Sequence, residues 1–333
     1  MPDKKSVNGS AINVAGLTKH YGEVLAVNNI SFDVTGGELF GFLGPNGAGK
    51  TTTINMLTGL ARLDAGTIHI GSIECTRNPK AAQHLVGVVP DESNLYPELT
   101  GFENLCFCAA LYGIGKKERQ IRAQQLLDIF GLNDAADRSF GGYSKGMKRK
   151  LTFAAGIIHE PPILFLDEPT TGIDVASARQ VRQIMADLHR KGTTIFLTTH
   201  YIEEAERLCQ RIAFIVNGRI VRTDHTATLL QPVQGKHVII FSVSNSGDDM
   251  TRKIASAFPQ YRFQNPKPNQ IRIESTEPVN VGPLVRFFEE HNIQVTEARR
   301  HVPSLEDVFV QVTGIEAGLM MKDKEKAGGG GNQ

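Results

Sequence analysis

The sequence predicts an open α/β domain that carries an all-helical insert and is followed by a small α+β unit. Three observations favour this class. Apolar strands alternate with helical segments along residues 11–230, a glycine-rich turn joins a strand to a helix near residue 44, and residues 101–160 read as helix alone. Parallel strands joined by helices form a sheet covered on both faces, so we expect a layered α/β core.

Composition limits the class of protein. The 333 residues suffice for two domains, and 41% hydrophobic with 21% charged residues is typical of a soluble globular protein. Because 36 basic and 35 acidic residues leave a net charge of +1, we expect no nucleic-acid partner. No apolar run approaches the roughly 20 residues that span a bilayer. The N-terminus lacks the pattern of a signal peptide, and four scattered cysteines favour free thiols in a reducing compartment.

The first part of the domain predicts antiparallel strands. Residues 1–10 are polar and are expected to be disordered, and apolar and polar residues then alternate up to Val34. Residues 39–43 form a wholly apolar strand. Further strands are expected at 67–70 and 85–89.

The glycine-rich turn has the spacing of a P-loop, Gly44-x-x-x-x-Gly49-Lys50-Thr51. Glycines allow the backbone N–H groups and the start of the helix to face phosphate oxygens. Lys50 would then reach the β- and γ-phosphates, and the Thr51 hydroxyl would bind Mg²⁺. The sequence therefore predicts a nucleoside triphosphate site made of Gly44, Pro45, Asn46, Gly47, Ala48, Gly49, Lys50, Thr51 and Thr52.

The spacing of apolar residues changes from strand-like to helical at residues 101–160 and returns to strand-like after them. This change predicts the helical insert and the strands that follow it. Helices are expected near 101–112, 117–131, 145–159, 175–190 and 201–209, with strands at 163–166, 194–197, 212–216 and 219–222. Asn217-Gly218 is a strong hairpin signal between the last two strands. The basic run of Lys145, Lys148, Arg149 and Lys150 is interpreted as a solvated helix face.

Residues 236–314 predict a separate α+β unit. Its order is strand 238–243, helix 250–257, strands 261–264 and 271–274, helix 280–291 and strand 293–298, which is typical of a ferredoxin-like split βαβ unit. A last helix follows Pro303, with a capping box from Ser304 to Asp307. Residues 315–333 are expected to be disordered.

Three polar side chains follow two of the buried strands. Asp167 and Glu168 end one strand, and His200 ends the next along the chain, at the sheet edge where ligands of α/β domains gather. Taken alone, the acidic pair would be a helix cap or surface pair, and the histidine a structural residue. Beside a P-loop, we expect Asp167 to serve Mg²⁺, Glu168 to accept a proton from water, and His200 to contact the γ-phosphate or hold Glu168.

These residues together resemble the nucleotide-binding subunit of an ABC transporter over residues 11–225. Tyr21 stands where the family has an adenine-stacking aromatic, and Tyr143-Ser-Lys-Gly-Met147 stands at the signature position. The D-loop corresponds to Thr171-Gly-Ile-Asp174, and Pro90-Asp-Glu92 corresponds to the Q-loop.

The resemblance implies ATP hydrolysis with Mg²⁺. Catalysis would rest on Glu168, His200 and Lys50, and the metal on Thr51, Asp167 and Asp91. It also implies a homodimer that sandwiches two ATP molecules, in which Ser144, Gly146 and Asp174 of one copy complete the site of the other. A separate multi-helix permease would hold the protein on the cytoplasmic face of the membrane. The segment Pro303–Phe309 resembles the closing motif of drug-resistance-type exporter ATPases, which favours export.

Two departures from the family pattern affect these roles. Lys145 and Met147 replace a glycine and a glutamine of the usual signature, but Ser144 and Gly146 remain. Asp91 replaces the usual Q-loop glutamine with a shorter, charged side chain, which changes its reach toward the cation.

Two other classes fit the sequence less well. A soluble ABC ATPase of translation would carry two cassettes, and one of DNA repair would carry long coiled coils, whereas this chain has one P-loop and no sustained heptads. A GTPase would carry an Asn-Lys-x-Asp motif, which this sequence lacks, and a kinase would not need Ser144 and His200 where they stand.

Overall fold

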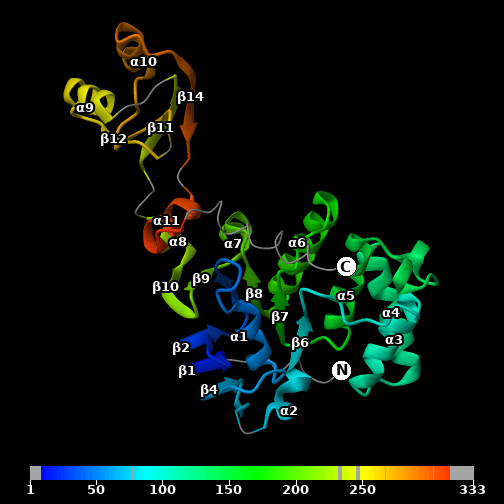
Figure 1. Ribbon diagram of the computed structural model, residues 1–333. Helices are drawn as coiled ribbons and strands as arrows, with labels where there is room; N and C mark the ends of the chain where they lie inside the picture. Colours follow the sequence, from blue (N-terminus) through cyan, green and yellow to red (C-terminus); the bar gives the residue numbers. More distant parts are fainter. Residues whose placement is uncertain are drawn as a thin grey trace, which may run out of the picture. The chain divides into compact units, whose positions relative to one another are not determined.

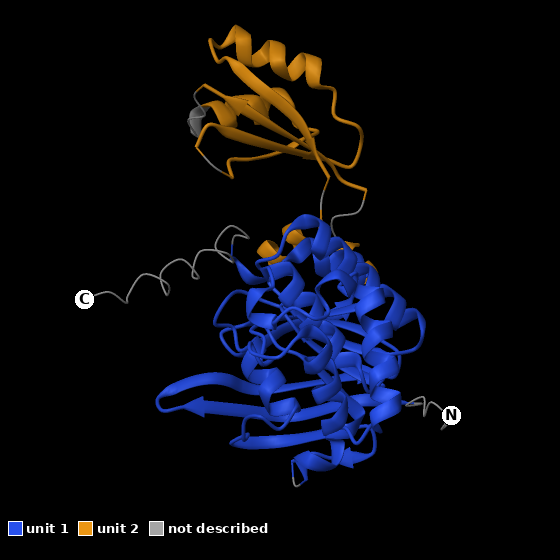
Figure 2. Ribbon diagram, turned by 90° about the vertical axis from the view of Figure 1, so that its right-hand side faces the viewer, with its two compact units in different colours: residues 1–226, 312–333 blue, residues 227–311 orange. Residues whose placement is uncertain are grey.

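The computed structural model describes residues 9–76, 78–231, 235–244, 248–266, 268–302 and 304–315. Its contacts divide the chain into two compact units, residues 1–226 with 312–333 and residues 227–311 (Figure 2). The two segments predicted to be disordered, 1–10 and 315–333, lie almost wholly outside the described residues.

A six-stranded sheet forms the centre of the first unit (Figure 1). Five of its strands are parallel, and the edge strand β10 runs antiparallel to β9. The order across the sheet is β10 (Arg219–His225), β9 (Arg211–Val216), β3 (Leu39–Leu43), β8 (Thr194–Thr199), β7 (Ile163–Asp167) and β6 (Val86–Val89). Every residue of β3, β7 and β8 is buried, as expected for strands covered on both faces.

The predicted hairpin between β9 and β10 is confirmed. Asn217 and Gly218 both have positive φ, 49° and 73°, as a type I′ turn requires. Gly218 also lies against the neighbouring backbone, because a Cβ there would be 2.8 Å from the Ala26 carbonyl oxygen.

A second, antiparallel sheet shares its core with the first. Its order is β2 (Val24–Thr35), β1 (Ser10–Tyr21), β4 (Ala65–Ile70) and β5 (Ile73–Glu74). Phe32 of β2 stacks on Phe40 of β3 with ring centroids 5.8 Å apart, and Phe196 of β8 lies 5.7 Å from Phe32. One apolar cluster therefore joins the two sheets.

Helices flank the six-stranded sheet and form the insert. Helix α1 (Lys50–Leu57) packs against β7 and β2, and α6 (Val175–Arg190) and α7 (Ile202–Leu208) pack against β8. The insert comprises α3 (Gly101–Leu111), α4 (Lys116–Phe130) and α5 (Lys145–Ile157), within one or two residues of the prediction at nearly every end. Helix α5 contacts α3 and α4 on one side and β6 and α6 on the other. The short α2 (Pro79–Ala82) and β5 were not expected.

The second unit has the predicted split βαβ order. It runs β11 (His237–Val243), α9 (Asp248–Ala257), β12 (Arg262–Gln264), β13 (Gln270–Ser275), α10 (Val281–Glu290) and β14 (Val295–His301), and the antiparallel sheet has the order β12-β13-β11-β14. Helices α8 (Thr226–Leu230) and α11 (Leu305–Thr313) flank this segment in the chain. At the start of α11, Asp307 Oδ2 accepts from Ser304 N at 2.9 Å, but Ser304 Oγ accepts from Glu306 N instead of Asp307 N.

We expect residues 236–302 to fold when expressed alone. The apolar cluster of this segment, which contains Phe241, Ile273 and Phe288, draws only on residues within it. Phe288→Ala should remove the cooperative thermal transition, because a buried Phe→Ala change costs about 3–5 kcal/mol, close to the whole stability of so small a domain. Exposed Arg252→Ala should change the free energy of unfolding by no more than about 0.5 kcal/mol. Circular dichroism melting tests this, and a parental fragment without a cooperative transition would contradict it.

Candidate active site

The phosphate-binding loop connects β3 to α1, and its glycines are required by close packing. A Cβ at Gly44 would lie 2.1 Å from the Ile215 carbonyl oxygen, and a Cβ at Gly49 would lie 2.5 Å from that of Ala26. Gly49 and Gly47 also have φ of 102° and 75°, which glycine adopts without strain. The loop is therefore held between β2 and β9 at Gly44 and Gly49, where a side chain would collide with neighbouring backbone.

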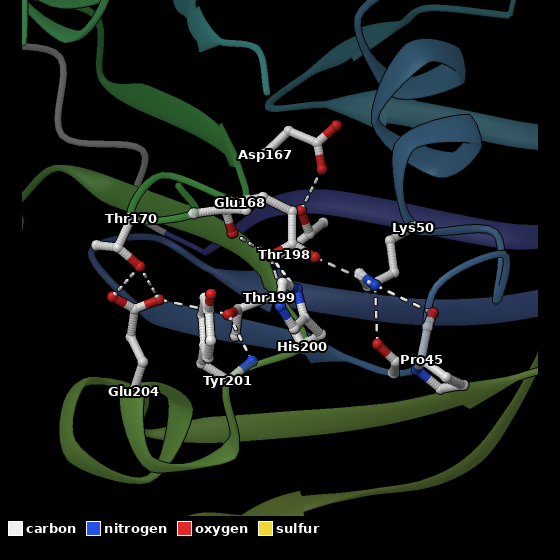
Figure 3. A network of polar contacts seen from close by, with 12 residues as sticks. Pro45, Lys50, Asp167, Glu168, Thr170, Thr198, Thr199, His200, Tyr201 and Glu204 are labelled. Carbon is white, nitrogen blue, oxygen red and sulfur yellow. Dashed lines mark hydrogen bonds and ion pairs between the residues drawn. The ribbon is translucent and has the colours of Figure 1, made fainter. Parts of the chain in front are cut away.

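The Lys50 ammonium lies buried between the loop and an acidic side chain (Figure 3). Its Nζ donates to the carbonyl oxygens of Gly44 at 2.8 Å and Pro45 at 3.1 Å. It lies 3.2 Å from Glu168 Oε1. The first residue of α1 is thus paired with the residue that follows β7.

Asp167 connects the end of β7 to its neighbours. The Thr198 hydroxyl of β8 donates to Asp167 Oδ1 (Figure 3). Burial raises the pKa of Asp167, and hydrogen bonds with the side chains of Thr198 and Thr51 oppose that rise. The Asp167 carboxylate is therefore held by β8, and the nearby Thr51 hydroxyl of the P-loop favours its charged form.

Glu168 has a left-handed backbone, with φ of 49°. This conformation is unfavourable for a residue with a Cβ, and strained residues of this kind are enriched at active sites. Its Oε2 lies 2.8 Å from His200 Nδ1 and accepts from Thr171 Oγ1 at 3.2 Å. Burial alone would raise the pKa of Glu168, but the hydrogen bond with His200 and the charge of Lys50 outweigh it and lower the pKa below its usual value. Glu168 is therefore a charged carboxylate at neutral pH.

One cavity brings together six residues of the phosphate-binding loop and two of the predicted carboxylates. It is lined by Asn46, Gly47, Gly49, Lys50, Thr51 and Thr52 of the loop, together with Ala26, Asp91 and Glu168. Asp91, which follows β6, thus reaches the same space as the P-loop and the carboxylate of Glu168. Hydroxyl, carboxylate and ammonium groups converge there, as binding of a metal-bound polyphosphate requires.

Nine predicted residues, all within the described ranges, do not line that cavity: Gly44, Pro45 and Ala48 of the loop, Asp167 and His200 at the strand ends, and Tyr21, Ser144, Gly146 and Asp174. Tyr21 ends β1 with half of its surface exposed, and Lys19 Nζ lies 5.2 Å from the centre of its ring. Ser144 is exposed and caps α5, its Oγ accepting from Met147 N at 3.3 Å. Asp174 caps α6 by accepting from Ser177 N at 2.9 Å, which lowers the pKa of Asp174. Gly146 is buried beside this cap, and a Cβ there would lie 2.6 Å from Ser177 Oγ.

The interpretation of the basic run as a solvated helix face is wrong for Arg149. Its side chain is only 6% exposed, and burial lowers the pKa of the guanidinium. Nε donates to the Pro169 carbonyl at 2.7 Å, and a terminal nitrogen donates to that of Asp167 at 2.7 Å. The spacing of residues along the helix indicates that Arg149 is buried, since it follows buried Gly146 by three residues and precedes buried Phe153 by four.

Glu204 is a second buried residue that sequence reasoning did not single out. Thr170 Oγ1 donates to its two carboxylate oxygens at 2.9 and 3.0 Å, and Thr199 Oγ1 lies 3.4 Å from Oε2 (Figure 3). Burial raises the pKa of Glu204. This residue links the loop after Glu168 to the end of β8, just before His200. In the sequence it stands in an acidic run that gives no sign of burial.

Other kinds of site find no support among the described residues. The four cysteines are free, and no cluster of three or more His, Cys, Asp or Glu side chains is arranged to hold a metal ion by itself. Within the same ranges, none of the helices combines the length and the hydropathy that crossing a bilayer requires.

Comparisons with known proteins agree with this geometry. The "ABC transporter" family model matches residues 27–171. The chain is 34% identical to the Daunorubicin resistance ATP-binding protein DrrA2 of Streptomyces coeruleorubidus, over 92% of this chain and 96% of that protein. It is 37% identical to the Fluoroquinolones export ATP-binding protein of Mycobacterium tuberculosis (strain CDC 1551 / Oshkosh), over 92% and 95%.

Solved structures match about two thirds of the chain. An ATP-binding subunit of an ABC transporter aligns with a TM-score of 0.62 and 30% identity, over 67% of this chain and 92% of that one. A dimeric ATP-binding cassette in a post-hydrolysis state with ADP and phosphate aligns with a TM-score of 0.61 and 25% identity, over 65% and 98%. The P-loop cavity, the strand-end carboxylates and these matches together show that the chain belongs to the ATP-binding proteins of the ABC transporter family.

Proposed function

We propose that this protein hydrolyses ATP to drive a separate membrane permease, and that the transport is export. The observation that carries the proposal is the position of Glu168. Its carboxylate is kept charged beside the P-loop cavity, between Lys50 and His200. The names of the relatives, which include resistance and export proteins, support the direction of transport.

The oxygen donors at the cavity fit Mg²⁺. Thr51 and Asp91 line the cavity with a hydroxyl and a carboxylate, and Asp167 supplies a second carboxylate at the end of β7; these are the ligand types this cation takes in nucleotide sites. Bound there, Mg²⁺ would neutralise charge on the β- and γ-phosphates. The loop amides and Lys50 would hold the phosphates, and exposed Tyr21 would stack on the adenine.

Hydrolysis would then depend on a short series of contacts. Glu168 accepts a proton from the attacking water, and His200 keeps the carboxylate in position through its 2.8 Å contact. Lys50 pairs with Glu168 in this structure. With nucleotide bound, its ammonium would offset the charge that accumulates on the phosphoryl oxygens. Glu204 supports both partners because it holds Thr170 after Glu168 and Thr199 before His200.

A second copy of the chain would complete each site. Ser144 is exposed at the N-terminus of α5, where backbone N–H groups favour an anion, yet it does not line the cavity of its own chain. Gly146 and Asp174 lie beside it. These three residues fit a role at the γ-phosphate bound by the other copy. The likeness to a dimeric cassette supports a homodimer.

Membership of the ABC transporter family is the basis for proposing a membrane permease as partner and a location at the membrane. A separate multi-helix membrane chain would use the closing and opening of the homodimer, and it would hold this protein on the cytoplasmic face of the membrane. A nucleic-acid partner is not proposed, given the near-neutral charge.

Glu168→Gln should abolish most hydrolysis while preserving binding. The amide keeps the shape but cannot accept the proton, so we expect a fall of at least about 100-fold in the hydrolysis rate. The variant should still bind ATP. It should accumulate as a homodimer, which size-exclusion chromatography in the presence of ATP measures. Glu203→Gln, at an exposed carboxylate nearby, is the matched control and should behave as the parent. Parental hydrolysis in Glu168→Gln would refute the assigned base, and a monomer at saturating ATP would refute the homodimer.

Asp91→Asn tests the acidic residue after β6 as a ligand of the cation. Removing one charged oxygen should raise the Mg²⁺ concentration needed for half-maximal binding of a non-hydrolysable ATP analogue by about tenfold. Calorimetry at a series of Mg²⁺ concentrations measures this without turnover. Exposed Glu92→Gln is the control. An unchanged Mg²⁺ dependence in Asp91→Asn would remove Asp91 from the metal site.

A further inference from the structure

Arg149 joins two loops of the candidate site through backbone carbonyl groups. Besides its bonds to Asp167 and Pro169, which flank Glu168, one terminal nitrogen donates to the carbonyl oxygens of Pro90 and Asp91, the latter at 3.0 Å. The loop after β6 and the loop after β7 are therefore held together by a single planar, permanently charged group.

Arg149 belongs to helix α5, whose N-terminus is capped by Ser144. Arg149 lies five residues after Ser144 on α5, which is continuous from Lys145 to Ile157. The start of α5 packs closely on the start of α6. A Cβ at Gly146 would collide with the side chains of Ser177 and Asp174. A shift of the two loops would therefore be transmitted to the N-terminus of α5.

We propose that Arg149 is a positioning residue that couples the nucleotide in its own site to the γ-phosphate contact made by Ser144 in the other site. This rests on the proposed function, in which Ser144 acts on the ATP of the second copy. Asp91 and Glu168 line the cavity, so nucleotide bound there sets the positions of both loops. Arg149 conveys those positions to α5, and the helix is then aligned for the partner.

Arg149→Lys separates this role from a structural one. Lysine keeps the charge, but its compact ammonium cannot span the carbonyls of both loops as the guanidinium fork does. In a Glu168→Gln background we expect the ATP concentration for half-maximal homodimer formation to rise about tenfold, as sedimentation velocity measures. Affinity for ADP, which lacks the γ-phosphate, should stay within about threefold of the parent by calorimetry, and Tm within a few degrees.

Lys150→Gln provides the matched control, since it removes a charge from the next position of α5 and should change neither quantity. Parental ATP dependence of dimerisation in Arg149→Lys would overturn the coupling. A parallel loss of ADP affinity or a large fall in Tm would show that Arg149 is only structural, and would overturn it as well. If the Glu168→Gln parent stays monomeric with ATP, the homodimer itself fails, and the coupling fails with it.

Discussion

The charge on Glu168 is the feature on which the rest of the site depends. A buried carboxylate must be compensated, and here Lys50 and His200 supply the compensation from two other segments. Each partner is delivered by a different parallel strand: Lys50 after β3, Glu168 after β7 and His200 after β8. The three strands are adjacent in the sheet, so their carboxyl ends meet, and the topology brings Lys50 and His200 to the Glu168 carboxylate.

Two kinds of hydrogen bond stabilise the surroundings of this charged group. Bonds between side chains hold the candidate site groups, as in Thr198 with Asp167 and Thr171 with Glu168. Bonds from the Arg149 side chain to backbone carbonyl groups hold the loops that carry them. Behind both lies the apolar cluster around Phe32, Phe40 and Phe196, which keeps the antiparallel sheet and the six-stranded sheet in one body. The phosphate loop lies where these two sheets meet, between Ala26 and Ile215.

Local patterns predicted the fold well, because period and turn chemistry are local properties. The apolar run at 163–166 and the Asn217-Gly218 turn each reported directly on the element that forms there. The strand-end residues were found because a P-loop implies which sheet edge matters. Glu204 could not be found in this way, because its burial depends on Thr170, which lies 34 residues away in the sequence. For Arg149, helical spacing indicates the buried face of α5, but no local pattern identifies its acceptors, such as Pro169, on other loops.

The use of carbonyl oxygens by Arg149 has a consequence for how the site can change in evolution. A carbonyl group is present whatever side chain the residue bears, so these hydrogen bonds to residues 90 and 91 require no particular side chain. The Asp91 carboxylate also attracts Arg149, so an amide at position 91 would keep the hydrogen bonds and lose that attraction. The chain carries aspartate there, and the loop keeps its attachment to the helix. Fixing the backbone in this way leaves the side chain at position 91, the proposed metal ligand, open to selection for a different metal affinity.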